Sequence, residues 1–460
     1  MTSAVIKEVR ATLSLAVPLA AANVAQMAMG VTDTVMVGSL GPVPLAAVGL
    51  GANFYFTIAV VCQGVVSAVS PLAAFAMGAA RRDEVGRITA SAFVLGAVFA
   101  VPLMAALTIA PRALAPIGYD PALIGGIGEF LHAIVWGTPG FLGFAVLRSL
   151  LAALSRPRAI MAVLVFGIGT NALLNWLLIF GHLGLPALGL AGSGYASAIN
   201  QWLMFLGLLC VASRLRREDW LSARYAALAT MTADMARILK LGLPIAGLQA
   251  VEVGVFFAST TVMGLFGANA LAAHQIALNC ASVTFMVPLG MSQAATVRIA
   301  AERGSGSFAA ARRAGVVALG LGIAFMSLSA AVFWSVPEPI VGAYIALGDP
   351  GNREVVALAL RFLAVAAVFQ IVDGLQAVAA GALRGYHDAT VPMILAGCGY
   401  WGIGFAGGLA FAFPLGAGPI GLWWGFVLGL SAVAALLTFR LLRNAAAAMP
   451  SGTALGEAHP

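Results

Sequence analysis

The sequence predicts an all-α polytopic membrane protein, with twelve transmembrane helices in two pseudo-symmetric bundles of six. Three observations predict it: the composition, the placement of the basic residues and an internal repeat. Of the 460 residues, 61% are hydrophobic and 9% are charged, whereas a soluble domain carries about 25% charged residues. The mean hydropathy is +1.00. This composition excludes a soluble enzyme, a nucleic-acid-binding protein and a disordered scaffold, and it makes the lipid bilayer the surrounding of the chain.

Twelve segments are long and apolar enough to cross a membrane, which takes about 20 residues. Charges and Gly/Pro turns separate them. Four contain a proline at which a bend is expected: Pro18, Pro71, Pro244 and Pro288. The first segment is longer than the apolar core of a signal peptide, about 7–15 residues, so we interpret it as a span. The approximate limits are 11–38, 45–78, 88–111, 127–147, 159–181, 189–213, 237–264, 270–299, 311–336, 355–382, 391–413 and 420–442.

Basic residues predict the orientation of these spans. With the amino terminus inside, 21 of the 24 Lys and Arg residues fall on inside segments. Arg148 is assigned to such a segment after span four, and only Arg112, Arg353 and Arg361 fall outside. The asymmetry predicts a plasma (bacterial inner) membrane protein with both termini cytoplasmic. The net charge of +7 then reflects residues that face anionic lipid, so no nucleic-acid partner is expected.

A shift of 226 residues aligns the beginnings of the two halves, and the offset later becomes 229. Leu15–Leu19 falls on Leu241–Ile245, and the glycines after span one fall on those after span seven. Since six spans is an even number, both halves insert in the same orientation, related by an axis along the membrane normal. Transporters of this build bind substrate near the bilayer midplane. The predicted domains are an N-terminal lobe at 1–213, a cytoplasmic inter-lobe loop at 214–236, a C-terminal lobe at 237–445 and a flexible tail at 446–460.

Three acidic residues, Asp33, Glu252 and Asp373, lie well inside predicted spans. Each costs at least about 2.5–3.5 kcal/mol at the bilayer centre, and no basic residue is predicted at mid-span. This favours a role in cation binding over a carboxyl held protonated within the bundle. If Glu252 and Asp373 approach each other, they would titrate as a coupled pair and exchange H⁺ or Na⁺ for an organic cation. Asp33 aligns with Ser259 and is the sole counterpart in the first half.

Amide side chains accompany these acids. Asn171 and Asn175 are four residues apart in span five and so share one helix face. Gln26 precedes Asp33 in span one, and Gln249 precedes Glu252 by nearly one turn. Such amides could ligate an ion or fix a carboxyl. They could equally form hydrogen bonds between helices, and both interpretations stay open.

Aromatic residues in the spans have two interpretations as well. Tyr55, Phe256 and Phe257 would suit the lining of a pocket for a flat cation, through cation–π attraction. Packing against helices or lipid is the simpler alternative. Trp423, near the start of a span, is expected to be an anchor at the membrane interface. His274 is expected in a structural contact between helices.

Several segments together resemble the multidrug and toxic compound extrusion (MATE) transporters of the NorM-like branch. The likeness covers roughly residues 10–445. The segments that carry it are Pro18–Leu19, Asp33–Gly38, Ala270–Asn279, Phe285–Gly290, Asp373–Gln376 and Gly381–Asp388.

The resemblance implies twelve helices in two lobes and export of amphipathic, often cationic compounds, driven by inward H⁺ or Na⁺. Glu252 and Asp373 match the carboxylates that serve cation coupling in the family. In this role they would bind the transported H⁺ or Na⁺. Asp33 matches the aspartate of span one. Asn171 and Asn175 match the polar pair of span five, where many relatives of another branch have Asp at the second position. Ser197 matches a hydroxyl of span six.

The expected function is therefore a secondary active multidrug antiporter that works by alternating access. A flippase for lipid-linked oligosaccharides is the alternative, although it would be expected to line its cavity with basic residues. A membrane-embedded enzyme is disfavoured because the chain has no HExxH or GxSxG motif. No cofactor or structural metal is expected, since the four cysteines lie singly in apolar runs. The default oligomeric state is a monomer.

Overall fold

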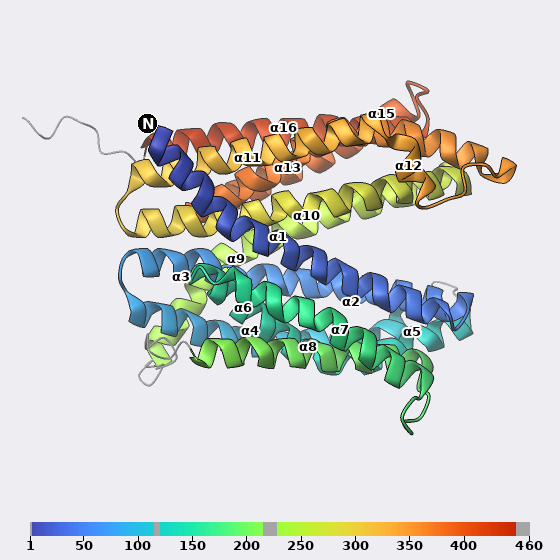
Figure 1. Cartoon of the computed structure of the whole chain (residues 1–460), viewed down its shortest axis with the longest axis horizontal. Helices are drawn as coiled ribbons and strands as arrows, with labels where there is room; N and C mark the ends of the chain where they lie inside the picture. Colours follow the sequence, from blue (N-terminus) through green and yellow to red (C-terminus); the bar gives the residue numbers. More distant parts are fainter. Residues whose placement is uncertain (1, 115–119, 215–227, 448–460) are drawn as a thin grey trace, which may run out of the picture. The chain divides into compact units, whose positions relative to one another are not determined.

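The computed structural model describes residues 2–114, 120–214 and 228–447, and this part of the chain is helical with no strand. Twelve of its helical segments are long and apolar enough to cross a membrane, which confirms the predicted fold class (Figure 1). The helices are α1 Thr2–Gly38, α2 Pro42–Val66, α3 Val69–Gly78, α4 Arg82–Leu114, α5 Pro121–Ile134, α6 Thr138–Ala153, α7 Pro157–Phe180, α8 Gly189–Arg214, α9 Leu228–Met263, α10 Ala268–Gly304, α11 Phe308–Ser335, α12 Pro337–Gly342, α13 Arg353–Gly385, α14 Thr390–Gly397, α15 Ala406–Ala412 and α16 Pro419–Ala447.

Three spans consist of more than one α-helix. The predicted span 45–78 is broken between α2 and α3, just before Pro71, which lies in the first turn of α3 where its missing N–H costs no helical hydrogen bond. The span from Pro121 to Ala153 joins α5 and α6 through the 3₁₀ turn η2, Val135–Gly137. The span from Thr390 to Ala412 contains the π-helical segment η6, Cys398–Phe405. The other three prolines lie inside α1, α9 and α10.

The chain forms two compact units. The amino-terminal unit comprises Val17–Met77 and Arg81–Gly254, and the carboxy-terminal unit comprises the chain up to Ala16, Gly78–Ala80 and the chain from Val255 onward. Two of the boundaries between the units fall inside long helices: one after Ala16 in α1 and one after Gly254 in α9. Of the predicted inter-lobe loop, residues 215–227 lie outside the described residues and 228–236 belong to α9. Most of the predicted tail, 448–460, also lies outside them.

In the amino-terminal unit, α2, α4, α5 and α6 enclose an apolar core. Its members include Tyr55 from α2, Leu103 from α4 and Leu131 from α5, each at most 6% exposed. Helices α7 and α8 pack against each other, and α8 also packs against α5 and α6. This packing brings α7 and α8 together as one wall of the unit.

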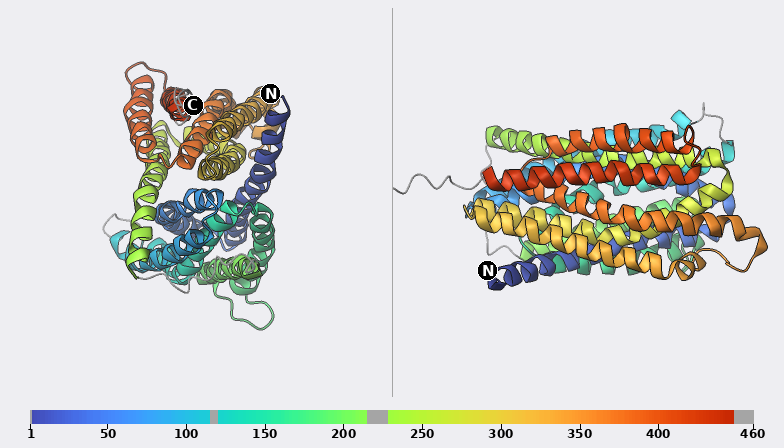
Figure 2. Two further views of the ribbon diagram at one scale, coloured as in Figure 1. Left: turned by 90° about the vertical axis from the view of Figure 1, so that its left-hand side faces the viewer. Right: turned by 90° about the horizontal axis from the view of Figure 1, so that it is seen from above.

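In the carboxy-terminal unit, α13 packs against α10, α11 and α16, and these helices run side by side in both views of Figure 2. Trp423 of α16 is fully buried in an aromatic cluster with Phe362 and Phe369 of α13 and Phe426. The prediction that Trp423 anchors the membrane interface is therefore wrong. Its position near a span start does not reveal that it faces α13.

Buried carboxylates near the starts of α1 and α9 are paired with arginine. Glu8, which is 4% exposed, accepts hydrogen bonds from Nε and Nη2 of Arg298 at 3.0 and 2.9 Å within the carboxy-terminal unit. Asp234, 3% exposed, binds Arg87 at 3.2 Å and Arg237 at 3.4 Å within the amino-terminal unit. Glu8 and Asp234 are equivalent under the shift of 226 residues. Each half of the repeat therefore begins with a carboxylate in an ion pair.

Candidate functional site

Asp33 of α1 is held by three neutral side chains from two other helices. Its Oδ1 accepts hydrogen bonds from Nδ2 of Asn171 at 2.9 Å and from Nδ2 of Asn175 at 2.6 Å. Its Oδ2 accepts from Oγ of Ser197 at 3.3 Å. The structure thus brings together four of the residues predicted for ion or substrate binding, all within the amino-terminal unit.

The local geometry of α7 and α8 explains this arrangement. Asn171 and Asn175 are 2% and 0% exposed and, being four residues apart, lie one turn apart on the same face of α7. The amide of Asn175 also donates to the backbone carbonyl of Asn171 at 3.0 Å, which fixes its direction. Gly192 lets α8 approach α7, because a Cβ there would collide with the backbone of Leu178. The close approach brings Ser197, one and a half turns further along α8, toward α1.

The charge of Asp33 is not balanced by a neighbouring cation. Within residues 2–114, 120–214 and 228–447, no salt bridge involves Asp33. Its three partners are neutral donors, so the ionised carboxylate leaves a net negative charge in a half-buried place. The carbonyl oxygens of Asn171 and Asn175, both buried, accept no hydrogen bond. A carboxylate beside free amide oxygens is a donor set for a proton or a hard monovalent cation.

The described part of the chain holds no cluster of three His, Cys, Asp or Glu residues that could bind a metal ion. Zinc, copper, iron and nickel centres are typically built from imidazole or thiolate ligands. The set around Asp33 has one carboxylate and otherwise only amide and hydroxyl groups. This donor set suits a proton or a hard cation.

A second layer of contacts, which the sequence analysis did not identify, supports the site. Thr170 of α7 donates to Oδ1 of Asn200 at 2.6 Å, and Nδ2 of Asn200 lies 3.3 Å from the sulfur of Met29. Asn200 follows Ser197 by three residues on α8, and Met29 precedes Asp33 by four on α1. Both residues share a helix face with a predicted site residue, so helical spacing could have predicted them.

The location of Arg148 differs most from the one predicted from the sequence. Arg148 does not lie in an inside loop: α6 continues for five residues beyond it, and its side chain is 9% exposed within the bundle. Its Nη1 donates to Oε1 of Gln26 at 2.9 Å, and its Nη2 donates to Oδ1 of Asn23. The assignment of Arg148 to an inside segment after span four is therefore wrong, since Arg148 lies within the span Pro121–Ala153, five residues before its end. Gln26, predicted as a neighbour of the ion site, instead binds this guanidinium.

In the carboxy-terminal unit, α13 carries a buried polar stripe. Asp373, 6% exposed, accepts from Nε2 of Gln376 at 3.4 Å. Gln370, fully buried one turn earlier, accepts from Thr284 of α10 at 3.0 Å and from Ser329 of α11 at 3.1 Å. Hydrogen bonds between helices thus account for the side-chain oxygen of Gln370, while Gln376 contacts the predicted carboxylate directly.

Glu252 and Gln249 belong to the other unit. Glu252 is half-buried on α9. Gln249, one turn earlier, lies over Gly64 of α2, where a Cβ would collide with its side-chain oxygen. Because Glu252 and Asp373 belong to different units, their predicted approach stays a prediction.

The aromatic candidates fit packing better than a pocket. Tyr55 is buried in the apolar core and donates its hydroxyl to Gln201 at 3.2 Å. Phe256 packs against Phe426, with ring centroids 5.1 Å apart. Phe257 is 74% exposed. His274 is fully buried and lies 3.2 Å from the hydroxyl of Thr260, in agreement with the structural contact expected for it.

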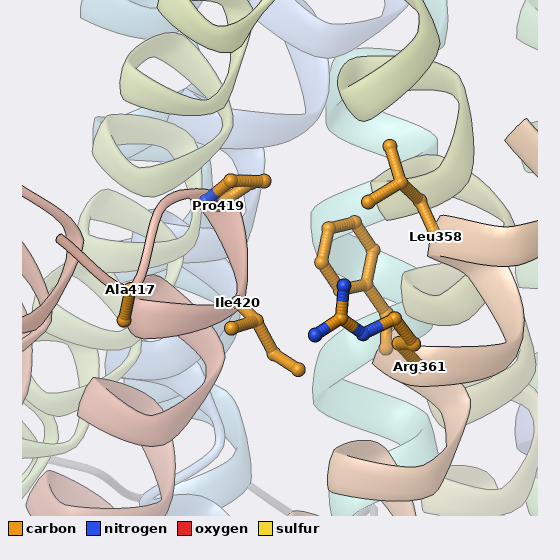
Figure 3. A pocket seen from close by; sticks show the side chains of 6 residues that line it. Leu358, Arg361, Ala417, Pro419 and Ile420 are labelled. Carbon is orange, nitrogen blue, oxygen red and sulfur yellow. The ribbon is translucent and has the colours of Figure 1, made fainter. Parts of the chain in front are cut away.

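Two pockets in the carboxy-terminal unit lie away from the carboxylates. The first, of about 50 Å³, has room for little more than water; Figure 3 shows Arg361 and Leu358 on one side and Pro419 and Ile420 on the other. The second, of about 370 Å³, is almost entirely apolar and is lined by residues of α15 and α16 and the turn between them, including Phe411 and Trp424. Neither has a charged residue of the predicted ion sites in its lining.

Comparison with known families identifies the fold. The model of the MatE family matches residues 18–177 and 244–409. The chain belongs to the MatE family. The two matched segments of this MatE chain begin 226 residues apart, the same shift that aligns its halves, so the family match supports the internal repeat. Membership makes the chain an integral membrane transporter.

Relatives cover almost the whole chain. A protein of Burkholderia mallei named "Probable multidrug resistance protein NorM" is 46% identical over 448 residues, covering 97% of this chain and 95% of the relative. The protein of the same name from Pseudomonas aeruginosa is 41% identical and covers 99% of this chain and 93% of its own length. Both are bacterial, which supports a location in the bacterial inner membrane.

Solved structures agree on the fold. The crystal structure of the eukaryotic MATE transporter AtDTX14 matches with a TM-score of 0.84 at 22% identity, covering 97% of this chain and 99% of that one. A structure described as the outward-facing conformation of a multidrug resistance MATE family transporter matches with a TM-score of 0.85 at 19% identity, covering 96% of both chains. At these identities, the likeness concerns the fold alone.

Proposed function

We propose that this MatE transporter is a cation-coupled multidrug antiporter. It exports amphipathic and cationic organic compounds in exchange for inward movement of H⁺ or Na⁺. The observation that carries the proposal is the Asp33 carboxylate, held by neutral donors beside two buried amide oxygens that accept no hydrogen bond. The names of the bacterial relatives, which are multidrug resistance proteins, support the substrate class.

The chemistry of the site suggests how the exchange is coupled. A proton or Na⁺ on Asp33 neutralises the one negative charge of this amide-rich site. When the ion leaves, the carboxylate again attracts a cation, and a drug cation can take its place. A ligand shifts the equilibrium between two conformations only through its different affinity for each. Occupancy of a half-buried carboxylate provides such a difference, and alternating access follows from it.

Glu252 and Asp373 form the second ion-binding element of the proposal. Both are carboxylates within spans, and intramembrane carboxylates mark ion pathways in transporters. Gln376 supports Asp373 in a way that resembles the support of Asp33 by its amides. The protein needs no cofactor beyond the coupling ion, works as a monomer and has both termini in the cytoplasm.

The test is the movement of a fluorescent organic cation in proteoliposomes of the purified protein, with H⁺ and Na⁺ gradients imposed separately. Movement under one gradient, and its loss in Asp33→Asn, would support antiport and identify the coupling ion. Ser193→Ala provides a matched control, because Ser193 is buried on α8 of the same unit and its hydroxyl has no hydrogen-bond partner. No movement under either gradient, in protein that binds the cation, would reject the proposal in favour of the flippase alternative.

A further inference from the structure

Asp33 and Arg148 are opposite charges in the interior of the amino-terminal unit, which also contains the half-buried Glu252 of α9. Among the described residues of α1 from Val17 onward, α2, α6, α7 and α8, Asp33 and Arg148 are the charged side chains that lie away from helix ends. The other two, Arg158 and Arg214, lie at the start of α7 and the end of α8. On the neighbouring α5, Glu129 is exposed, and the charged residues of α4 lie near its two ends.

The two charges lie along one stripe of α1. Arg148 binds Asn23 and Gln26, and Asp33 follows Gln26 by seven residues. Residues seven apart lie on the same helix face, two turns from each other. At a rise of 1.5 Å per residue, Gln26 and Asp33 are about 10 Å apart along the helix axis. The guanidinium is therefore close enough to influence the carboxylate electrostatically but too far away to form an ion pair with it.

Arg148 has no carboxylate partner of its own. None of the salt bridges within residues 2–114, 120–214 and 228–447 includes it, and its two hydrogen-bond acceptors are neutral amide oxygens. A buried charge without a counter-charge is costly. Asp33 provides the only opposite charge on this stripe, and it provides it only while no ion is bound. Binding of the coupling ion to Asp33 thus leaves Arg148 uncompensated.

We propose that Arg148 is an internal cation that lowers the affinity of the Asp33 site for the coupling ion, so that the ion can be released in each cycle. The inference rests on the proposed role of Asp33 as an ion site. Two unit charges about 10 Å apart, at an effective dielectric constant of about 20, change a binding constant by about tenfold. Arg148 acts through the field and not by contact with the ion, so it is a tuning residue of the site.

The test compares Arg148→Gln with Arg148→Lys in proteoliposomes. We expect Arg148→Gln to lower the half-saturating concentration of the coupling ion by about tenfold, and to lower the maximal rate because release is slower. Arg148→Lys keeps the charge and is expected to keep the ion dependence of the wild type. An equal shift in both variants, or no shift in either, would overturn the proposal.

A second variant separates the charge from the fold. Gln26→Glu keeps Arg148 and places a carboxylate beside its guanidinium, so we expect it to raise the ion affinity in the same direction as Arg148→Gln. Gln26→Leu removes the hydrogen bond without adding charge, and is expected not to raise the affinity. Failure of Gln26→Glu to raise it in folded protein would contradict the proposal even if Arg148→Gln does not fold.

Asp33→Asn distinguishes a failure of the proposed function from a failure of the proposed role of Arg148. If Asp33→Asn leaves the ion dependence of transport unchanged, the proposed function fails together with this inference. If Asp33→Asn abolishes coupling but Arg148→Gln and Gln26→Glu leave the ion affinity of the site unchanged, only the role of Arg148 is refuted.

Discussion

Helix α1 carries two carboxylates in different surroundings. Near its start, Glu8 is 4% exposed and receives two hydrogen bonds from the guanidinium of Arg298. Twenty-five residues later, Asp33 is half-buried and receives hydrogen bonds from neutral amides and a hydroxyl. The first carboxylate has its counter-charge built into the protein. The second has no counter-charge in contact with it.

This difference separates a structural role from a functional one. A two-pronged arginine–carboxylate contact is among the strong charge-assisted interactions, and it leaves no net charge for a mobile ion to neutralise. Neutral donors orient a carboxylate but keep its negative charge, so an external cation still gains by binding. The repeat sharpens the contrast, since the counterpart of Glu8, Asp234, is also paired with arginine. The counterpart of Asp33 is Ser259, which has no charge.

The largest expected effect is on coupling. Asp33→Asn removes the charge that the ion neutralises, and we expect the affinity for the coupling ion to fall by at least about 100-fold. Glu8→Gln, a change of the same kind on the same helix, is expected to leave the ion dependence of the folded protein unchanged. The measurement is cation transport against ion concentration in proteoliposomes. If Glu8→Gln abolished coupling as Asp33→Asn does, the distinction between the two carboxylates would fail.

The second prediction concerns stability, for which we expect Glu8 to matter more than Asp33. Glu8→Gln leaves the mostly buried guanidinium of Arg298 without its main partner. Because Arg298 is 24% exposed, we expect a loss near the lower end of the range for a broken buried pair, about 3 kcal/mol. Asp33→Asn is expected to change stability far less. Thermal unfolding of the two variants in detergent checks this, and an equal melting temperature for wild type and Glu8→Gln would contradict it.

The third prediction tests the amides around Asp33. Asn175 is the closest donor to the carboxylate, at 2.6 Å, and its own carbonyl oxygen accepts no hydrogen bond. We expect Asn175→Ala to lower the affinity for the coupling ion by about tenfold, the lower end of what loss of a supporting ligand costs. Direct ion binding to the purified variant, measured by calorimetry, gives the number. Wild-type affinity would show that the amides only pack the helices together.

The smallest effect is expected at Ser197. Its hydroxyl donates to Asp33 over 3.3 Å, so Ser197→Ala should weaken ion binding by only about threefold, or about 0.6 kcal/mol. Ser193 is the matched control: it lies one turn earlier on α8, is fully buried, and its hydroxyl has no hydrogen-bond partner. The same assay should show no change for Ser193→Ala. A loss of equal size in both would point to packing of α8 as the cause.

Part of the candidate site was accessible from the sequence. Asn171 and Asn175 were identified as a pair because a spacing of four residues places them on one helix face. Asp33 stood out because an acid inside an apolar span is costly. The sequence places Gln26 before Asp33 in the same span, but it does not predict the contact of Gln26 with Arg148, 122 residues away. Spacing predicts which residues share a face, and it does not predict which helix that face meets.

The sequence by itself determined the twelve spans and the repeat, because the length of an apolar segment and its punctuation by glycine and proline are local properties of the chain. Only the tertiary structure decided the partners. Arg148 lies five residues before the end of its helix and could have faced lipid headgroups, but the packing of the bundle turns it onto α1. Arg298 binds Glu8 across 290 residues, and Trp423 fills the aromatic core of its unit. Such contacts depend on how helices pack against each other, and the sequence of a single helix does not predict that packing.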